Sequence, residues 1–409
     1  RKLLLLAVLL TLGAGAKAQV TTTDVSGYDY VFYNQDFITI PGAEVSFPLF
    51  MKNKQGVRSF QFQISLPSEA VDGSTKVETA GLNNARFATK NGGTVFDCNV
   101  QPDGSIMVIG TILHEDGFYV GDDVIGYLSF TVPEDAALGE YAVTYKEAIF
   151  DFGGSQVNVT DGITSKLIVS SELVFDENSS YLPGYVSGKD ANVTVKRTIK
   201  ANQWSTIVLP FRASIKALLG ALGDENAEFA AFSSFERDDD EDKIQMKFTA
   251  YTGTNLVAGR PYLVKTTKDI SEFSLETVRM ANAVSNVTVE DPDEGYVGMF
   301  TGSFVKTIVP ADGLFISGNK FYYSKGETNI KGLRGWFELE VTLDDKSVDA
   351  GTKIRFSVDD EATSIDGISE ITKYADGVYS VTGAKVSEDS LEGLPAGVYI
   401  VNGKKVYKK

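Results

Sequence analysis

Large apolar residues alternate with polar ones along much of this chain. The alternation is clearest over residues 59–66, Ser-Phe-Gln-Phe-Gln-Ile-Ser-Leu. Successive side chains of a β-strand point to opposite faces, so one set should line a core and the other should face water. The expected core set is Phe60, Phe62, Ile64 and Leu66, and the expected solvent set is Gln61, Gln63 and Ser65. Pro67 should end this strand because proline has no N–H for the sheet ladder.

Short segments of the same kind recur after turn residues. A Pro-Asp-Gly turn at 102–104 precedes the apolar run 106–109, and a Gly-Asp-Asp turn at 121–123 precedes the run 124–132. Many short strands at close spacing are typical of antiparallel sandwiches. We therefore expect an all-β protein with two antiparallel β-sandwich domains and a short β tail.

A helical period occurs in one segment, residues 214–222. Its apolar positions are Ile215, Leu218, Leu219 and Leu222. Gly223 follows, and a glycine just past the last periodic residue commonly ends a helix. The sequence predicts one short helix at this place.

The first 18 residues are basic, then apolar, then small. Two basic residues precede the apolar run 3–12, and Ala16 and Ala18 supply small residues before Gln19. This order is typical of a secretory signal peptide, and the run is too short to span a bilayer permanently. We expect cleavage before Gln19 and a bacterial protein that is secreted, extracellular or at the cell surface, with no transmembrane segment in the mature chain.

Composition divides the chain into five parts. The length after the signal allows two or three domains at roughly 150 residues each. The expected parts are a signal peptide at 1–18, a first sandwich at 19–170, a polar linker at 171–190, a second β-rich domain at 191–358 and a β tail at 359–409.

Charge and cysteine content narrow the classes of partner and site. The net charge of −17 opposes binding to nucleic acid or to an anionic membrane surface. The one cysteine, Cys98, cannot form an intramolecular disulfide, so core packing must hold the fold. Because Cys98 lies in a strand-like run at 94–100, we expect a small buried core residue there.

Groups suited to catalysis or metal binding are few. His114 is the only histidine and lies beside two acids and a glycine, which is typical of a loop. The acidic run 238–242 departs from a calcium-binding loop, because Lys243 and Thr249 stand where that loop needs glycine and glutamate. We expect no catalytic residue, metal or cofactor. Because a glycosidase needs only two carboxylates and the chain has 55 acidic residues, a glycosidase remains an open alternative.

Aromatic side chains are the candidate ligand-binding groups, because sugar rings stack on aromatic faces. The densest stretch in the first domain contains Tyr28, Tyr30, Phe32 and Tyr33. The first three of these would share one strand face, which could equally be a core face. The second domain has the same ambiguity at Phe321, Tyr322, Tyr323 and Trp336.

Three segments of the first domain resemble the cohesin family and the carbohydrate-binding modules related to it. They are 41–49 with the strand at 59–66, 104–106 leading into 126–133, and 136–141 leading into a closing strand at 163–169. The resemblance implies a jelly-roll sandwich over about residues 20–170. It also implies a binding function, with either a dockerin-like protein module or a polysaccharide as the partner.

The tail resembles the end of the C-terminal sorting domains of type IX secretion. The matching residues are Gly-Val-Tyr-Ser-Val-Thr-Gly at 377–383 and Gly-Val-Tyr-Ile-Val-Asn-Gly at 397–403. The tail is shorter than a full sorting domain. The resemblance implies export and attachment at the cell surface.

These observations favour a non-catalytic exported recognition protein. In this hypothesis the cohesin-like module binds polysaccharide or a partner of an extracellular polysaccharide-degrading assembly. Two alternatives stay open: a structural or adhesive surface protein with the sandwiches as spacers, and a β-sandwich glycoside hydrolase.

Overall fold

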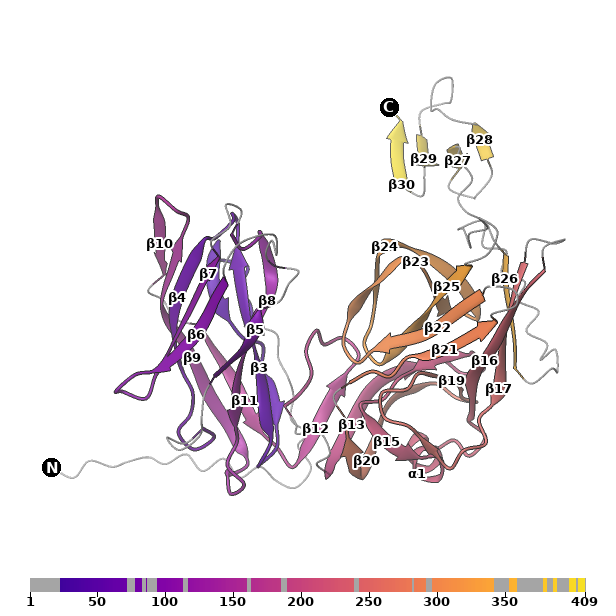
Figure 1. Cartoon of the computed structure of the whole chain (residues 1–409), viewed down its shortest axis with the longest axis horizontal. Coiled ribbons are helices and arrows are strands. Elements are labelled where there is room, and N and C mark those ends of the chain that lie inside the picture. The colour runs from indigo at the N-terminus through magenta and orange to yellow at the C-terminus, as the bar shows by residue number, and fades with distance from the viewer. Residues whose placement is uncertain are drawn as a thin grey trace. The chain divides into compact units, whose positions relative to one another are not determined.

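The computed structural model shows a chain built almost entirely of β-strands (Figure 1). The described residues are 23–71, 78–82, 86, 94–112, 117–159, 163–184, 190–238, 243–281, 283–291, 296–341, 353–358, 378–380, 385–387, 397–401 and 404–408. The chain forms two compact units, residues 1–196 with 272–282, and residues 197–271 with 283–409.

Two facing sheets make the first unit a β-sandwich. One sheet has the order β1-β3-β8-β5, with β1 at Tyr30–Tyr33, β3 at Glu44–Asn53, β8 at Gly121–Thr131 and β5 at Glu78–Leu82. The other has the order β2-β11-β9-β4-β7-β6, with β2 at Phe37–Thr39, β11 at Thr164–Val169, β9 at Gly139–Asp151, β4 at Ser59–Ser65, β7 at Ile106–Ile112 and β6 at Thr94–Val100. A short strand, β10 (Gln156–Val159), also pairs with β9, and β2 with β11 is the parallel pair among these strands.

Stacked phenyl rings fill the core between these sheets. The ring of Phe32 lies 4.3 Å from that of Phe62 and 4.6 Å from that of Phe150, centroid to centroid. The expected core face of β4 is confirmed, because Phe60, Phe62 and Ile64 are all buried and Gln61 and Gln63 are only half-buried. Leu66 lies just past the end of β4 and packs against the same core while half-buried.

Residues 170–184 fold back against the first sandwich. The Tyr181 hydroxyl donates a hydrogen bond to the Asp36 carbonyl at 2.6 Å, and its ring lies 5.7 Å from that of Phe37. The Gly184 N–H donates to the Ile38 carbonyl at 3.1 Å. Within this stretch, β12 (Glu172–Asp176) pairs in parallel with β13 (Asp190–Ile199). Part of the segment predicted as a linker, 171–190, therefore belongs to the first unit.

The second unit is also a sandwich of two sheets. The first has the order β14-β19-β16-β17-β26, with β14 at Ser205–Ile207, β19 at Tyr262–Lys265, β16 at Glu228–Asp238, β17 at Lys243–Ala250 and β26 at Lys353–Val358. The second has the order β21-β22-β25-β23-β24, with β21 at Val287–Asp291, β22 at Tyr296–Ser303, β25 at Arg334–Val341, β23 at Thr307–Ser317 and β24 at Lys320–Ile330. Phe232, Phe248, Phe300 and Phe337 lie in the core between them.

The remaining described elements lie outside the sheets of the two sandwiches. The predicted helix is present as α1 (Ile215–Leu222), where Ser214 accepts a hydrogen bond from the Ala217 N–H and Gly223 takes a left-handed φ of 59°. Four further strands are β15 (Phe211–Ser214), β18 (Asn255–Leu256), β20 (Ile270–Met280) and the tail strand β27 (Val378–Ser380). Of these, β15 and β18 pair with each other in antiparallel orientation. The tail sheet has the order β28-β27-β29-β30, with β28 at Lys385–Ser387, β29 at Gly397–Val401 and β30 at Lys404–Lys408.

Several sequence-based predictions concern residues outside the described set. These are the signal peptide at 1–18 with its cleavage before Gln19, His114, residues 239–242 of the acidic run, and most of the tail from 359 onward. They stay predictions.

Candidate recognition face

The outer face of the sheet that contains β4 and β7 carries side chains from four neighbouring strands. Cross-strand pairing places Asp97, Ile109, Gln61 and Ile149 in one row across β6, β7, β4 and β9. The next row is Asn99, Met107, Gln63 and Lys146, and the row on the other side is Val95, Thr111, Ser59 and Asp151. The face is therefore an array of side chains from four hydrogen-bonded strands, with a bulge in the β4–β9 pairing between Gln61 and Gln63.

Aliphatic side chains lie exposed in the part of this array formed by β6 and β7. Val95 is 48% exposed and Ile109 is 39% exposed, although both are apolar. Met107 and Ile149 are half-buried beside them, and Gln61 and Gln63 lie between β7 and β9. An apolar centre with polar surroundings is the anatomy of a protein interface. We call these six residues, together with Asp97, the recognition face.

The edge strand β6 is blocked against pairing with another strand at two of its backbone groups. The Thr79 hydroxyl of β5 donates to the Phe96 carbonyl at 2.8 Å. The Asp97 carboxylate accepts the Cys98 N–H at 2.8 Å. Exposed sheet edges are templates for strand addition, and side-chain contacts of this kind reduce that hazard. These two groups are therefore not available for pairing with an added strand.

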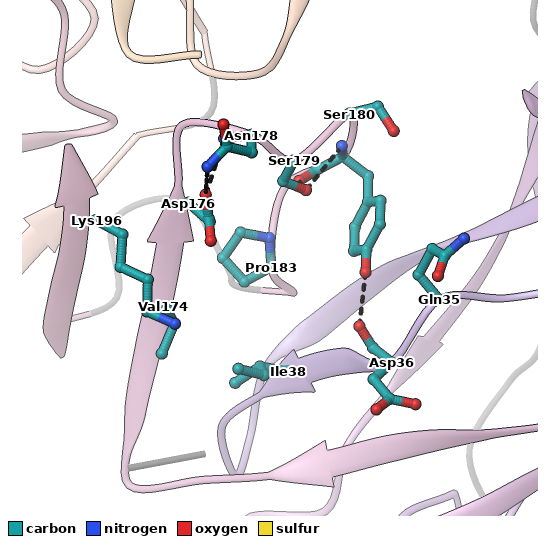
Figure 2. Close-up of a pocket in the computed structure, with 11 residues that line it drawn as sticks. Gln35, Asp36, Ile38, Val174, Asp176, Asn178, Ser179, Ser180, Pro183 and Lys196 are labelled. Carbon is teal, nitrogen blue, oxygen red and sulfur yellow. Dashed lines mark hydrogen bonds between the residues drawn. The ribbon is translucent and has the colours of Figure 1, made fainter. Parts of the chain in front are cut away.

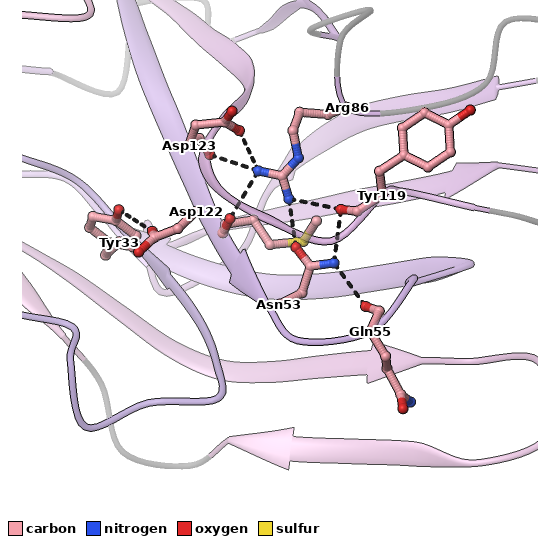
Figure 3. Close-up of polar contacts among 8 residues, drawn as sticks. Tyr33, Asn53, Gln55, Arg86, Tyr119, Asp122 and Asp123 are labelled. Atoms are coloured by element: carbon pink, nitrogen blue, oxygen red, sulfur yellow. Dashed lines mark hydrogen bonds and ion pairs between the residues drawn. The ribbon is translucent and has the colours of Figure 1, made fainter. Parts of the chain in front are cut away.

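A second cluster of polar groups surrounds Arg86, whose side chain is almost fully buried. Figure 3 shows its guanidinium between Asn53 and Asp123. Nη2 donates to Asn53 Oδ1 at 2.5 Å and to the Tyr119 carbonyl at 3.2 Å, and Nη1 forms an ion pair with Asp123. Gly121 leaves room for it, because a Cβ there would lie 2.8 Å from Arg86 Cζ. These contacts are all with the protein itself, so the Arg86 cluster connects residue 86 to β3 and β8 and serves the fold.

Near the Arg86 cluster, the Tyr33 side chain is hydrogen-bonded to β8. Its hydroxyl donates to Asp122 Oδ1 at 2.6 Å (Figure 3). Burial, together with this hydrogen bond to a carboxylate, raises the pKa of the Tyr33 phenol above its ordinary value. The phenol therefore stays a neutral donor at physiological pH.

A cavity of about 270 Å³ lies where residues 174–183 meet β2, and Figure 2 shows its lining. The Asp36 carboxylate accepts the Lys166 N–H at 3.0 Å, and Asp176 Oδ1 accepts the backbone and side-chain N–H groups of Asn178 at 2.8 and 2.9 Å. Because neighbouring groups of the chain engage both carboxylates, the polar lining serves the fold.

The predicted ligand-binding residues of the first domain are mostly in the interior. Tyr30, Phe32 and Tyr33 are buried, and Tyr28 is half-buried. Both faces of β1 are covered, because Tyr30 and Phe32 point into the main core while Tyr33 packs in a smaller cluster on the other side. Tyr28 and Tyr30 also line an open hollow of about 730 Å³. The Lys54 ammonium lies 5.7 Å from the Tyr30 ring centroid. The four residues do not form an exposed strip of coplanar rings.

Cys98 packs against the core, as expected, but it is half-buried and not buried. Its partial exposure follows from the position of β6 as an edge strand. Among the described residues, no cluster of three His, Cys, Asp or Glu side chains could hold a metal ion. The described part of the chain also has no helix suited to crossing a bilayer.

Sequence reasoning missed the recognition face, although a signal was present. In a sheet with one solvated face, apolar and polar residues alternate. Residues 106–109 are instead all apolar, which puts Met107 and Ile109 on the outer face. A break in the alternation thus marks an apolar surface.

Comparisons with known proteins find cohesin domains among solved structures. The sixth cohesin of scaffoldin B from Acetivibrio cellulolyticus, in complex with a dockerin, is 18% identical with a TM-score of 0.26, covering 35% of this chain and 98% of that one. A non-cellulosomal cohesin from the archaeon Archaeoglobus fulgidus is 20% identical with a TM-score of 0.23, covering 34% and 93%. The third ScaB cohesin from R. flavefaciens, in complex with a group 1 dockerin, is 17% identical with a TM-score of 0.25, covering 36% of this chain and 99% of that one.

At these identities and TM-scores the likeness assigns neither a family nor a function to this chain. No family model and no curated protein matches the sequence.

Proposed function

We propose that the first unit is a non-catalytic module that binds a protein partner through the recognition face, outside the cytoplasm. The observation that carries the proposal is the exposure of Val95 and Ile109 on adjacent strands within a rigid sheet. Aliphatic side chains favour a protein surface, whereas a sugar-binding surface needs exposed aromatic rings. The signal-peptide pattern at 1–18 supports the location.

The partner class to test first is a dockerin-like module. Two of the cohesins named above were solved in complex with dockerins. A partner of that kind would bury roughly 800 Å² on each side, with a few central anchors supplying most of the binding energy. Ile109 lies in the middle row of the face, between Asp97 and Gln61, and is the expected anchor.

The test is isothermal titration of the full chain with a panel of recombinant dockerins. Binding is expected for at least one member, and Ile109→Arg should weaken it at least tenfold, which corresponds to about 1.4 kcal/mol. Leu138→Arg is the matched control, because Leu138 is 59% exposed but lies just before β9, outside the recognition face. Equal affinity of the Ile109→Arg variant and the wild type would exclude the recognition face.

The non-catalytic part of the proposal has its own test. The full chain is incubated with a panel of polysaccharides, and reducing ends are measured. Release of reducing sugar would establish the glycoside hydrolase alternative. If neither sugar release nor partner binding is found, the spacer alternative is favoured.

A further inference from the structure

Three aromatic residues lie in one row across the outer face of the second sheet of the second unit. Phe315 of β23 pairs directly with Tyr322 of β24, and their rings are stacked, with centroids 5.7 Å apart and an interplanar angle of 24°. On the other side of β23, Leu314 pairs with Phe337, which places Phe315 opposite Trp336 of β25. The row is therefore Trp336, Phe315 and Tyr322 on three neighbouring strands.

The row lies on the face away from the core. The residues that precede or follow it along each strand, Leu314, Phe321 and Phe337, belong to the core between the two sheets. Tyr322 is 43% exposed, whereas Phe315 is half-buried and packs against the small cluster that contains Trp336, so Tyr322 is the most exposed residue of the row. Trp336 is only 9% exposed and lies buried at one end of the row, where it packs with Val309, and its indole N–H donates to Glu338 Oε1 at 2.8 Å.

Polar side chains flank the row on both sides. Ser317 pairs with Lys320 in the neighbouring row, and Arg334 lies at the start of β25 on the same side. Glu338 lies on the other side, where it already accepts the indole N–H. An aromatic row with polar side chains in the adjacent positions differs from the aliphatic recognition face of the first unit.

We propose that this row binds a neutral polysaccharide chain of pyranose units. The C–H groups on one face of a pyranose ring carry partial positive charge, and the face of an aromatic ring is negative, so the two attract. The hydroxyls at the edge of the sugar can pair with Ser317, Lys320 or Arg334. A polyanionic glycan is disfavoured, because a chain with a net charge of −17 repels it. This row belongs to the second unit and the recognition face to the first, so neither proposal depends on the other.

The test is native affinity electrophoresis of the full chain through gels that contain a soluble neutral glucan or mannan. Retardation is expected in at least one gel, and Tyr322→Ala should weaken binding about five- to tenfold. Tyr322→Phe keeps the ring and should retain most of the affinity. Ile308→Ala is the control, because Ile308 is 53% exposed on β23 but has no ring, and it should bind like the wild type.

Two further measurements complete the test. Thermal melting of each variant shows whether the fold is retained, and sedimentation velocity shows whether the chain self-associates. Absence of retardation in every neutral gel by the folded wild type would overturn the proposal, as would equal retardation of Tyr322→Ala. Self-association that Tyr322→Ala abolishes would assign the row to a second copy of this chain and would also overturn it.

Discussion

Phe60 occupies the space that a side chain on Gly110 would need. The two residues pair across β4 and β7, and a Cβ on Gly110 would lie 2.2 Å from Phe60 Cζ. The glycine allows the phenyl ring to lie flat across the inner face of β7, where it contacts Phe32 and Phe118 at centroid distances of 5.0 and 5.1 Å. The same strand pair carries the recognition face on its other side.

Gly110→Ala should therefore destabilise the first unit by about 1–3 kcal/mol, because the Phe60 ring must move within a packed core. The free energy of unfolding in urea measures this cost. Gly154→Ala is the control, since no atom lies within 4 Å of the position its Cβ would take. Equal stability of the two variants would mean that Phe60 packs elsewhere.

Phe62→Ala should cost about 3–5 kcal/mol, because a fully buried ring is lost and a cavity is left. Gln61→Ala, on the solvent face of the same strand, should change the free energy of unfolding by no more than about 0.5 kcal/mol. Chemical denaturation of both variants compares the two faces of β4. Similar costs would contradict the register described for this strand.

Arg86→Ala should cost about 2–3 kcal/mol, because it leaves Asn53 Oδ1 and the Tyr119 carbonyl without the guanidinium. Arg86→Lys should recover only part of this, since an ammonium cannot bridge several acceptors as a planar guanidinium does. Differential scanning calorimetry measures both variants. Lys54→Ala removes an exposed ion pair with Asp29 and should leave the melting temperature essentially unchanged.

Tyr181→Phe should cost about 1 kcal/mol, the usual contribution of one hydrogen bond, here the one to the Asp36 carbonyl. Tyr181→Ala should cost more, because the ring contacts with Phe37 and Phe50 are also lost. Hydrogen exchange of the Gly184 amide reports release of residues 170–184 from the sandwich. Unchanged protection of that amide in Tyr181→Ala would show that Tyr181 does not hold this segment.

The parts of the fold that local sequence determines were predicted well. Strict alternation over 59–66 gave both faces of β4, and the run 94–100 coincides with β6. The helix at 215–222 followed from its period and its terminal glycine. In each case neighbouring residues along the chain carry the information.

Features that depend on distant residues could not be predicted in this way. Tyr30, Val31, Phe32 and Tyr33 are all apolar, so no period shows that both faces of β1 are covered. Arg86 lies in no strand pattern, and its partners Asn53 and Asp123 are 33 and 37 residues away. The aromatic row of the second unit likewise depends on which strands become neighbours.

The two occupied backbone groups on the edge of β6 bear on how the selectivity of the recognition face could be altered. If a ligand strand added to that edge, main-chain groups that every sequence shares would supply much of the affinity. Thr79 and Asp97 occupy two of those groups on β6, so under the proposed function selectivity would depend more on the outward-facing side chains. Substitutions at such positions change the free energy of unfolding little, so the surface that a partner meets can change without loss of the fold.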